Sequence, residues 1–237
     1  MHIRTNRRSK DRWRSPHAWK RLSAIAALLA APLLTACGGE ESLSARTERA
    51  AQEGSAPAQF NLASMYLYGD GVEQNAERAV EWFLKAAEQG HIEAQYNLGK
   101  AFAEGVGAGA DREAAGKWYR LAAEQGNAEA QFRLGRLLDR GDPRSEAATW
   151  YLAAAEQRHA AAQYHLGRLY REHAQQPSDY LEAYVWLRLA ADFDDRAYKL
   201  LEEMVGFQRE NGEFMIDRFQ IKEAKARLAA WLEKHQQ

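Results

Sequence analysis

Residues 81–90 read Glu-Trp-Phe-Leu-Lys-Ala-Ala-Glu-Gln-Gly, and copies of this stretch return later in the chain. The copies lie at residues 117–126, 149–158 and, in weaker form, 185–192. Their tryptophans, Trp82, Trp118, Trp150 and Trp186, are 36, 32 and 36 residues apart. A fixed period of about 20 to 50 residues is typical of repeat proteins, in which each unit packs only on its neighbours. The spacing therefore predicts a row of stacked repeats.

Each repeat is predicted to be a helical hairpin. In the first copy, residues 58–66 carry apolar side chains at helical spacing, and Gly69 favours the end of that helix. Asn75 is expected to cap a second helix, from residue 76 to about residue 88. One position of the first helix is always small, as Ala63, Gly99, Gly135 and Gly167. Because a glycine inside a helix costs about 1 kcal/mol relative to alanine, we expect the second helix to approach closely there. The tryptophan is expected to pack over the gap as a core residue, not as a platform for bases or sugars.

Two motifs resemble a known family. Residues 94–99, Ala-Gln-Tyr-Asn-Leu-Gly, and residues 118–126, Trp-Tyr-Arg-Leu-Ala-Ala-Glu-Gln-Gly, are similar to Sel1-like repeats, which are relatives of tetratricopeptide repeats. The resemblance implies an all-α fold, an α–α superhelix (solenoid) with first helices lining the inner surface. It also implies an adaptor that binds other proteins. The repeats are expected at residues 58–91, 92–127, 128–159 and 160–196.

Capping helices are expected at both ends of this array. An orphan second helix with a polar outer face is predicted within residues 43–57, because Ala50-Ala51-Gln52-Glu53-Gly54 repeats the helix end seen at 86–90. Residues 197–237 are expected to form two helices joined by a turn at Asn211-Gly212. The last helix has an apolar stripe, which either closes the final hydrophobic face or lies on a membrane or a partner.

The first 36 residues are predicted to be a signal peptide. A basic leader precedes a thirteen-residue apolar segment, residues 22–34, that is too short to span a bilayer. Leu34-Thr35-Ala36-Cys37 then resembles the lipobox of bacterial lipoproteins. This resemblance implies lipidation of Cys37, cleavage before it and a short tether over residues 37–42. Gly38 behind the cysteine resembles lipoproteins sorted to the outer membrane, facing the periplasm. The alternative is an ordinary signal peptide with an incidental cysteine.

Composition and motifs argue against several classes of function. The net formal charge is −1, but residues 1–36 hold eight Lys or Arg and one Asp, which leaves the remainder acidic and unsuited to nucleic acid. The sequence has no phosphate-binding loop, dinucleotide fingerprint, nucleophile elbow or zincin helix. No metal site, cofactor or catalytic residue is therefore predicted. A peptidoglycan- or β-lactam-active enzyme stays as a less favoured alternative.

The strongest candidates for binding are polar side chains beside the packed stripe of each first helix. Two slots three residues apart recur in each repeat and hold Asn61 and Ser64, Asn97 and Lys100, Arg133 and Arg136, and His165 and Arg168. Residues at i and i+3 share a helix face, so stacked repeats would align them along the inner surface. Arginine suits carboxylates because its guanidinium can donate two parallel hydrogen bonds. The hypothesis is a membrane-anchored scaffold that binds an acidic peptide segment, a partner's C-terminus or an anionic polysaccharide.

Two alternatives to this hypothesis stay open. The eight residues could simply be solubilising side chains with partners on their own helices. The protein could also be a scaffold component of polysaccharide export or cell-envelope assembly.

Overall fold

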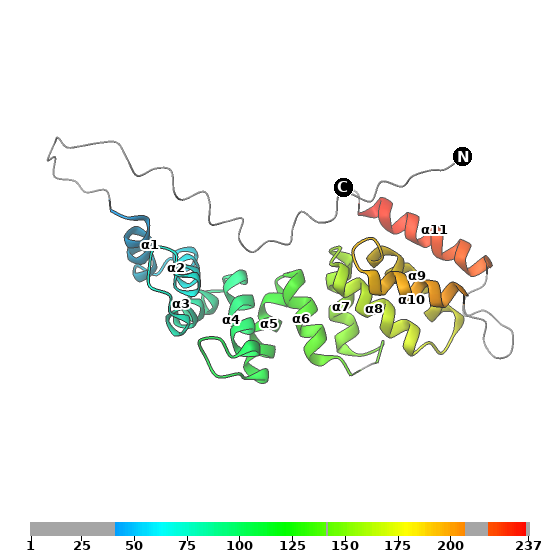
Figure 1. Cartoon of the computed structure of the whole chain (residues 1–237), viewed down its shortest axis with the longest axis horizontal. Coiled ribbons are helices and arrows are strands. Elements are labelled where there is room, and N and C mark those ends of the chain that lie inside the picture. The colour runs from blue at the N-terminus through cyan, green and yellow to red at the C-terminus, as the bar shows by residue number, and fades with distance from the viewer. Residues whose placement is uncertain (1–40, 141, 207–217, 236–237) are drawn as a thin grey trace, which may run out of the picture. The chain divides into compact units, whose positions relative to one another are not determined.

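The computed structural model describes residues 41–140, 142–206 and 218–235, and every regular element in these ranges is an α-helix (Figure 1). The helices are α1 (Leu43–Gln52), α2 (Ala56–Tyr68), α3 (Ala76–Glu88), α4 (Ile92–Glu104), α5 (Arg112–Glu124), α6 (Ala128–Leu138), α7 (Glu146–Glu156), α8 (Ala160–Glu172), α9 (Pro177–Ala190), α10 (Asp195–Gly206) and α11 (Arg218–Lys234). The most extensive contacts join α2 to α3, α4 to α5, α6 to α7 and α8 to α9. These pairs are the predicted hairpins, and the all-α solenoid is confirmed. Cys37, the signal peptide and the turn at Asn211-Gly212 lie outside the described residues.

The helix ends follow from local chemistry. The side chain of Asn75 accepts a hydrogen bond of 2.9 Å from the backbone N–H of Arg78, which confirms its role as the N-cap of α3. Helices α2 and α4 end at Gly69 and Gly105, whose φ angles of 74° and 71° lie in the left-handed region that glycine adopts without strain. Helix α2 begins at Ala56, two residues before the expected start of the first repeat.

The core is built from the same positions in every repeat. One leucine of each first helix is almost completely buried, at Leu62, Leu98, Leu134 and Leu166. Paired alanines near the end of each second helix are buried as well, as at Ala86 and Ala87. Because these small residues let the next first helix come close, successive hairpins share one continuous apolar interior.

The side chain that packs over each glycine is not the tryptophan, so this prediction is wrong. A Cβ placed on Gly99 would lie 2.7 Å from the ring of Tyr119, and one on Gly135 would lie 2.7 Å from the ring of Tyr151. Both tyrosines directly follow a repeat tryptophan. Adjacent residues of a helix point about 100° apart, so the tyrosine faces its own hairpin while the tryptophan is directed elsewhere.

Trp118, Trp150 and Trp186 instead join their repeats to the repeat before. Trp118 packs on the core cluster of the first repeat, and Trp150 packs on that of the second. Trp186 belongs to the cluster of the third repeat and is 6% exposed, whereas the other three are half-buried. Trp150 uses its exposed edge to donate a hydrogen bond of 3.2 Å from Nε1 to Glu146. The tryptophans are thus packing residues between repeats.

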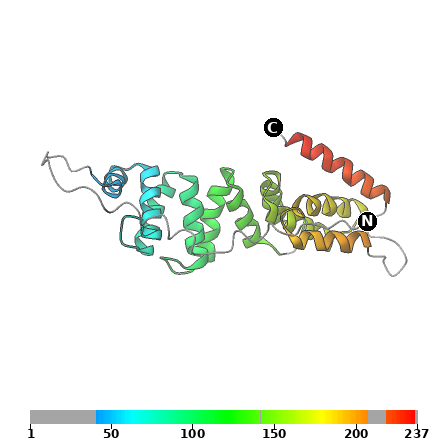
Figure 2. The ribbon, with the colours of Figure 1, turned by 45° about the horizontal axis from the view of Figure 1, so that its top comes forward.

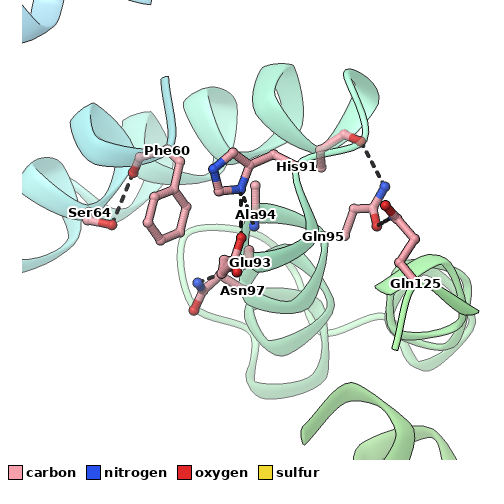
Figure 3. A network of polar contacts seen from close by, with 9 residues as sticks. Phe60, Ser64, His91, Glu93, Ala94, Gln95, Asn97 and Gln125 are labelled. Carbon is pink, nitrogen blue, oxygen red and sulfur yellow. Dashed lines mark hydrogen bonds and ion pairs between the residues drawn. The ribbon is translucent and has the colours of Figure 1, made fainter. Parts of the chain in front are cut away.

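A ladder of buried glutamines adds a polar connection between the repeats. In each first helix one glutamine donates from Nε2 to a backbone carbonyl eight residues earlier, at 3.1 Å; the donors are Gln59, Gln95, Gln131 and Gln163. Gln95 also accepts a hydrogen bond of 2.7 Å from Gln125, as Figure 3 shows. The two bonds satisfy both polar atoms of a buried amide. We call this arrangement the glutamine ladder.

Both ends of the array are covered by atypical helices. The carbonyl of Ala51 on α1 receives the hydrogen bond from Gln59, so α1 takes the place of a preceding second helix. Helix α10 repeats the buried pattern of a first helix with Ala197, Leu201 and Met204, but Glu202 replaces the glycine. The four repeats have only glycine or alanine at that position, and the much larger glutamate leaves no room for the close approach seen over Gly99 and Gly135. Helix α11 lies against α9 instead, and the two views in Figures 1 and 2 show it beside that hairpin. Its predicted apolar stripe therefore faces the protein through Ala224 and Trp231.

Candidate partner-binding face

The eight predicted binding residues lie on the first helices of the four repeats, two on each of α2, α4, α6 and α8. We refer to them as the first-helix face: Asn61, Ser64, Asn97, Lys100, Arg133, Arg136, His165 and Arg168. Asn61 and Arg136 are exposed, and the other six are half-buried. The residues differ in whether their polar atoms are already engaged within the chain, and this decides what each can offer a partner.

In the first two repeats the small polar side chains bond to their own helices. Ser64 donates from Oγ to the carbonyl of Phe60 at 3.0 Å, and Asn97 donates from Nδ2 to the carbonyl of Glu93 at 2.9 Å (Figure 3). Bonds of this kind run back one helical turn and leave the oxygen of Asn97 as a free acceptor. Within the described part of the chain, Lys100 has no carboxylate within 4.0 Å. Its ammonium group is therefore available.

A cavity of about 280 Å³ lies beside Asn97 and Lys100, between α2, α3 and α4. Its apolar wall includes Ala79, Val80 and Phe83 of α3. Tyr68 stands at its edge and is 75% exposed, which makes it one of the most exposed large apolar side chains of the described chain. An apolar floor with an aromatic edge and a few polar groups is the usual make-up of a binding pocket. Sequence reasoning located the two polar residues but missed the cavity and Tyr68.

In the third repeat one arginine is engaged and the other is free. The Nε of Arg133 lies 2.8 Å from a carboxylate oxygen of Glu129, and the ring Nε2 of His159 lies 2.8 Å from the other oxygen. Burial by itself raises the pKa of Glu129, but the hydrogen bonds from His159 and Arg133 lower this pKa below its ordinary value. Arg136 has no ion pair within the described residues and lies over the ring of Phe132, 6.0 Å from its centroid.

In the fourth repeat neither residue is a free cation. His165 is stacked on the ring of Tyr151 at 5.3 Å, and its Nδ1 is buried and forms no hydrogen bond with any residue that the structure describes. Burial, followed by the positive charges of Arg168 and Arg136, lowers the pKa of His165 to about 4. The imidazole is therefore neutral at pH 7.

Arg168 is held from two sides. It pairs with Asp139 at 3.2 Å and with Glu172 at 2.6 Å, while Tyr151 donates its own hydrogen bond of 3.1 Å to Asp139. The partners come from the preceding repeat and from the next turn of α8, so the guanidinium is fixed in place.

Within the part of the chain that the structure describes, the first-helix face thus has two cations without an ion pair, Lys100 on α4 and Arg136 on α6, and a pocket lies beside the first. Arrangements of this type can bind a carboxylate through charge and an adjoining apolar side chain through burial. Among the described residues no group of three His, Cys, Asp or Glu side chains is placed to hold a metal ion. Nor do these residues include a helix with the length and hydropathy needed to cross a bilayer.

Stacked helical hairpins, each with a small residue in the first helix where the second helix packs closely, define an all-α solenoid. The chain belongs to the Sel1 repeat family, whose family model matches residues 56–91, 92–127, 128–159 and 160–192. Sel1 repeats mediate protein–protein interactions, and the family typically provides non-catalytic scaffolds.

Two solved structures are similar to this chain. A protective antigen present in uropathogenic Escherichia coli strains, which displays an SLR fold, is 29% identical with a TM-score of 0.63 over 78% of this chain and 40% of that chain. A Sel1 repeat protein from Oxalobacter formigenes is 35% identical with a TM-score of 0.59 over 68% of this chain and 48% of that chain. This chain therefore spans less than half of either structure. A comparison with curated proteins found no match.

Proposed function

We propose that this chain is a lipid-anchored scaffold in the periplasm that binds an acidic segment of a partner protein on the first-helix face. The observation that carries the proposal is the pair of cations, Lys100 and Arg136, that have no ion pair within the described chain. Both occupy equivalent slots on neighbouring first helices, at the second position of each pair. An acidic segment lying across the two repeats would meet both charges, and an apolar side chain beside it would enter the cavity at Phe83.

The proposal is tested by reversing these two charges. Cells carrying the full-length protein with Lys100→Glu and Arg136→Glu are lysed, and the protein is affinity-purified from membranes together with what binds it. We expect the co-purifying partner to be lost, because each carboxylate would then face a like charge. A matched control, Lys222→Glu with Lys225→Glu, makes the same change in charge at exposed sites on α11. Equal recovery of the partner by both variants would refute the binding site. Release by a polyanionic polysaccharide with no protein partner detected would favour a polymer as the ligand.

The anchor is proposed from the Leu34-Thr35-Ala36-Cys37 motif. Several acyl chains on one cysteine would bind a bilayer very tightly, since each buried methylene contributes about 0.8 kcal/mol. Cys37→Ser should therefore move the protein from the membrane fraction to the soluble periplasmic fraction and abolish labelling with radioactive palmitate. Membrane association that persists in Cys37→Ser would contradict lipid anchoring. Separation of inner and outer membranes on a density gradient tests the proposed outer-membrane location.

A further inference from the structure

The glutamine ladder is incomplete in the fourth repeat. In the first three repeats the Oε1 of the buried glutamine accepts a hydrogen bond from a second glutamine at the end of the second helix. The pairs are Gln59 with Gln89 at 2.7 Å, Gln95 with Gln125 at 2.7 Å and Gln131 with Gln157 at 2.8 Å. Gln163 is 3% exposed and keeps its bond to the carbonyl of Ala155 at 3.1 Å. Its Oε1, however, receives no hydrogen bond from the described residues.

The missing donor is replaced by Phe193. The backbone N–H of Phe193 bonds to the carbonyl of Ala190 at 2.9 Å, as that of Gln157 bonds to Ala154 at 3.1 Å, so the two residues occupy equivalent places. The ring of Phe193 is 79% exposed and does not fill the space of the absent amide. Gln163 as a residue is buried, but its Oε1 is not one of the fully buried atoms that lack a partner, so this acceptor stays open to solvent where Gln157 covers its equivalent in the preceding repeat.

A cavity of about 340 Å³ opens at this point, between the start of α8, the end of α9 and α11. Gln163 lines it together with an apolar wall of Leu189, Leu228 and Leu232. Trp231 belongs to the same wall, and its indole Nε1 is buried and has no hydrogen-bond partner among the described residues. The lining thus contains one open acceptor, the Oε1 of Gln163, to which no described residue donates.

Two arginines lie at the same cavity. Arg188 pairs with Asp192 at 3.0 Å, whereas Arg158 has no ion pair within the described chain. Arg158 has a φ of 66°, in the left-handed region that Gly90 and Gly126 occupy in the earlier repeats. Residues other than glycine are disfavoured in this conformation. We therefore take the arginine at this position as a sign that its guanidinium group binds a ligand.

We propose that this cavity receives the side-chain carboxamide of a glutamine or asparagine from a partner protein, next to an acidic residue that faces Arg158. The nitrogen of a carboxamide can donate to the Oε1 of Gln163, as that of Gln157 donates to Gln131 in the preceding repeat. A carboxylate lacks the donor, and an ammonium group would be repelled by the arginines. The guest amide would occupy the place that Gln157 fills in the preceding repeat. The inference rests on the proposed role as a protein-binding scaffold but not on the first-helix face.

The test uses three peptides of one design, in which the central residue of acetyl-Ala-Leu-Gln-Glu-Leu-N-methylamide is kept, changed to Glu or changed to Met. Each is titrated into the ¹⁵N-labelled mature chain, and the indole N–H signal of Trp231 is assigned with Trp231→Phe. We expect a saturable shift with the glutamine peptide and at least tenfold weaker binding of the other two. Equal binding of all three peptides, or no saturable shift, would overturn the proposal.

Phe193→Gln supplies the matched variant, because it restores the internal donor and closes the site. It should weaken binding of the glutamine peptide at least tenfold, whereas Phe193→Ala should preserve binding. Unchanged binding in Phe193→Gln would also overturn the proposal. Lys100→Glu with Arg136→Glu should leave peptide binding intact, so the failure of this site and the failure of the first-helix face give different results.

Discussion

In repeats one and two the first-helix face holds Asn61, Ser64, Asn97 and Lys100, whereas in repeats three and four the same slots hold arginine and histidine. The richer charge of the later repeats does not make them the more available surface. Arg168 is fixed by Asp139 and Glu172, and His165 is half-buried and neutral, while Lys100 has no ion pair in the described chain and lies beside a cavity. The difference teaches that the residue type at a position does not determine whether its charge is available to a partner. Availability depends on the carboxylates that neighbouring turns and repeats place beside that residue.

What the two halves share is the close approach of the helices within a hairpin, and disturbing it should have the largest effect. Gly135→Leu would drive its side chain into the ring of Tyr151, 2.7 Å from the position of the new Cβ, with the carbonyl of Ala147 only 3.3 Å away. We expect a loss of about 3 kcal/mol in the free energy of unfolding, from overpacking that helix propensity offsets only in part.

Gly109→Leu is the control for this substitution, because a Cβ there meets no atom within 4 Å. Urea unfolding followed by circular dichroism measures both variants. A loss for Gly135→Leu no greater than that for Gly109→Leu would contradict the close packing of Tyr151.

The second-largest effect on stability is expected from the difference between a cation that forms ion pairs and one that does not. Arg168→Met removes one partner of the half-buried Asp139, so it should cost about 1–3 kcal/mol of stability. Lys100→Met breaks no ion pair and should stay within about 0.5 kcal/mol of the parent protein. Both changes replace a cation with methionine and differ only in what the cation contacts. Similar urea midpoints for the two variants would show that Asp139 and Glu172 do not hold Arg168 as described.

Much of this architecture could be predicted from the sequence, because it depends on short-range patterns. The cap at Asn75 and the buried side chain of Leu98 depend only on residues within one hairpin. The repeat itself follows from the regular spacing of the tryptophans along the sequence. Which of two adjacent aromatics covers a glycine was not predictable, since Trp118 and Tyr119 are both apolar and differ only in direction. The state of each cation depended on residues far along the chain. Asp139 lies 29 residues before Arg168, and no local rule connects them.

The buried histidine predicts a pH dependence confined to the later half. The pKa of His165 is lowered to about 4 by burial, and in the unfolded chain it returns to about 6.5. The unfolded state therefore binds the extra proton first as the pH falls. The stability contributed by the neutral ring is complete above about pH 6.5 and is lost as the pH falls towards 4.

His165→Asn, which copies the residue of repeats one and two, should remove this part of the dependence. Thermal unfolding at several pH values between 7.5 and 4.5 measures the slope. A slope that is unchanged in the variant would assign the acid sensitivity in this pH range to groups other than His165. The pKa of Glu129 is lowered from 4.5, so the stability that this carboxylate contributes is lost only as the pH falls below about 4.5 and does not enter the measured range.

The smallest effects are expected in the glutamine ladder, where the first three repeats and the fourth predict opposite signs. Gln125→Met leaves the Oε1 of Gln95, which is 4% exposed, without its donor and should cost about 1–2 kcal/mol. Phe193→Gln supplies the donor that Gln163 lacks and should add about 0.5–1.5 kcal/mol to the free energy of unfolding. The two substitutions act on equivalent positions, so differences in helix position do not explain a difference in sign. If Phe193→Gln stabilised the chain and Gln125→Met did not destabilise it, the gain would come from the removal of an exposed aromatic ring and not from a new hydrogen bond. Opposite signs of similar size would show that the fourth repeat gives up stability to keep a polar atom open.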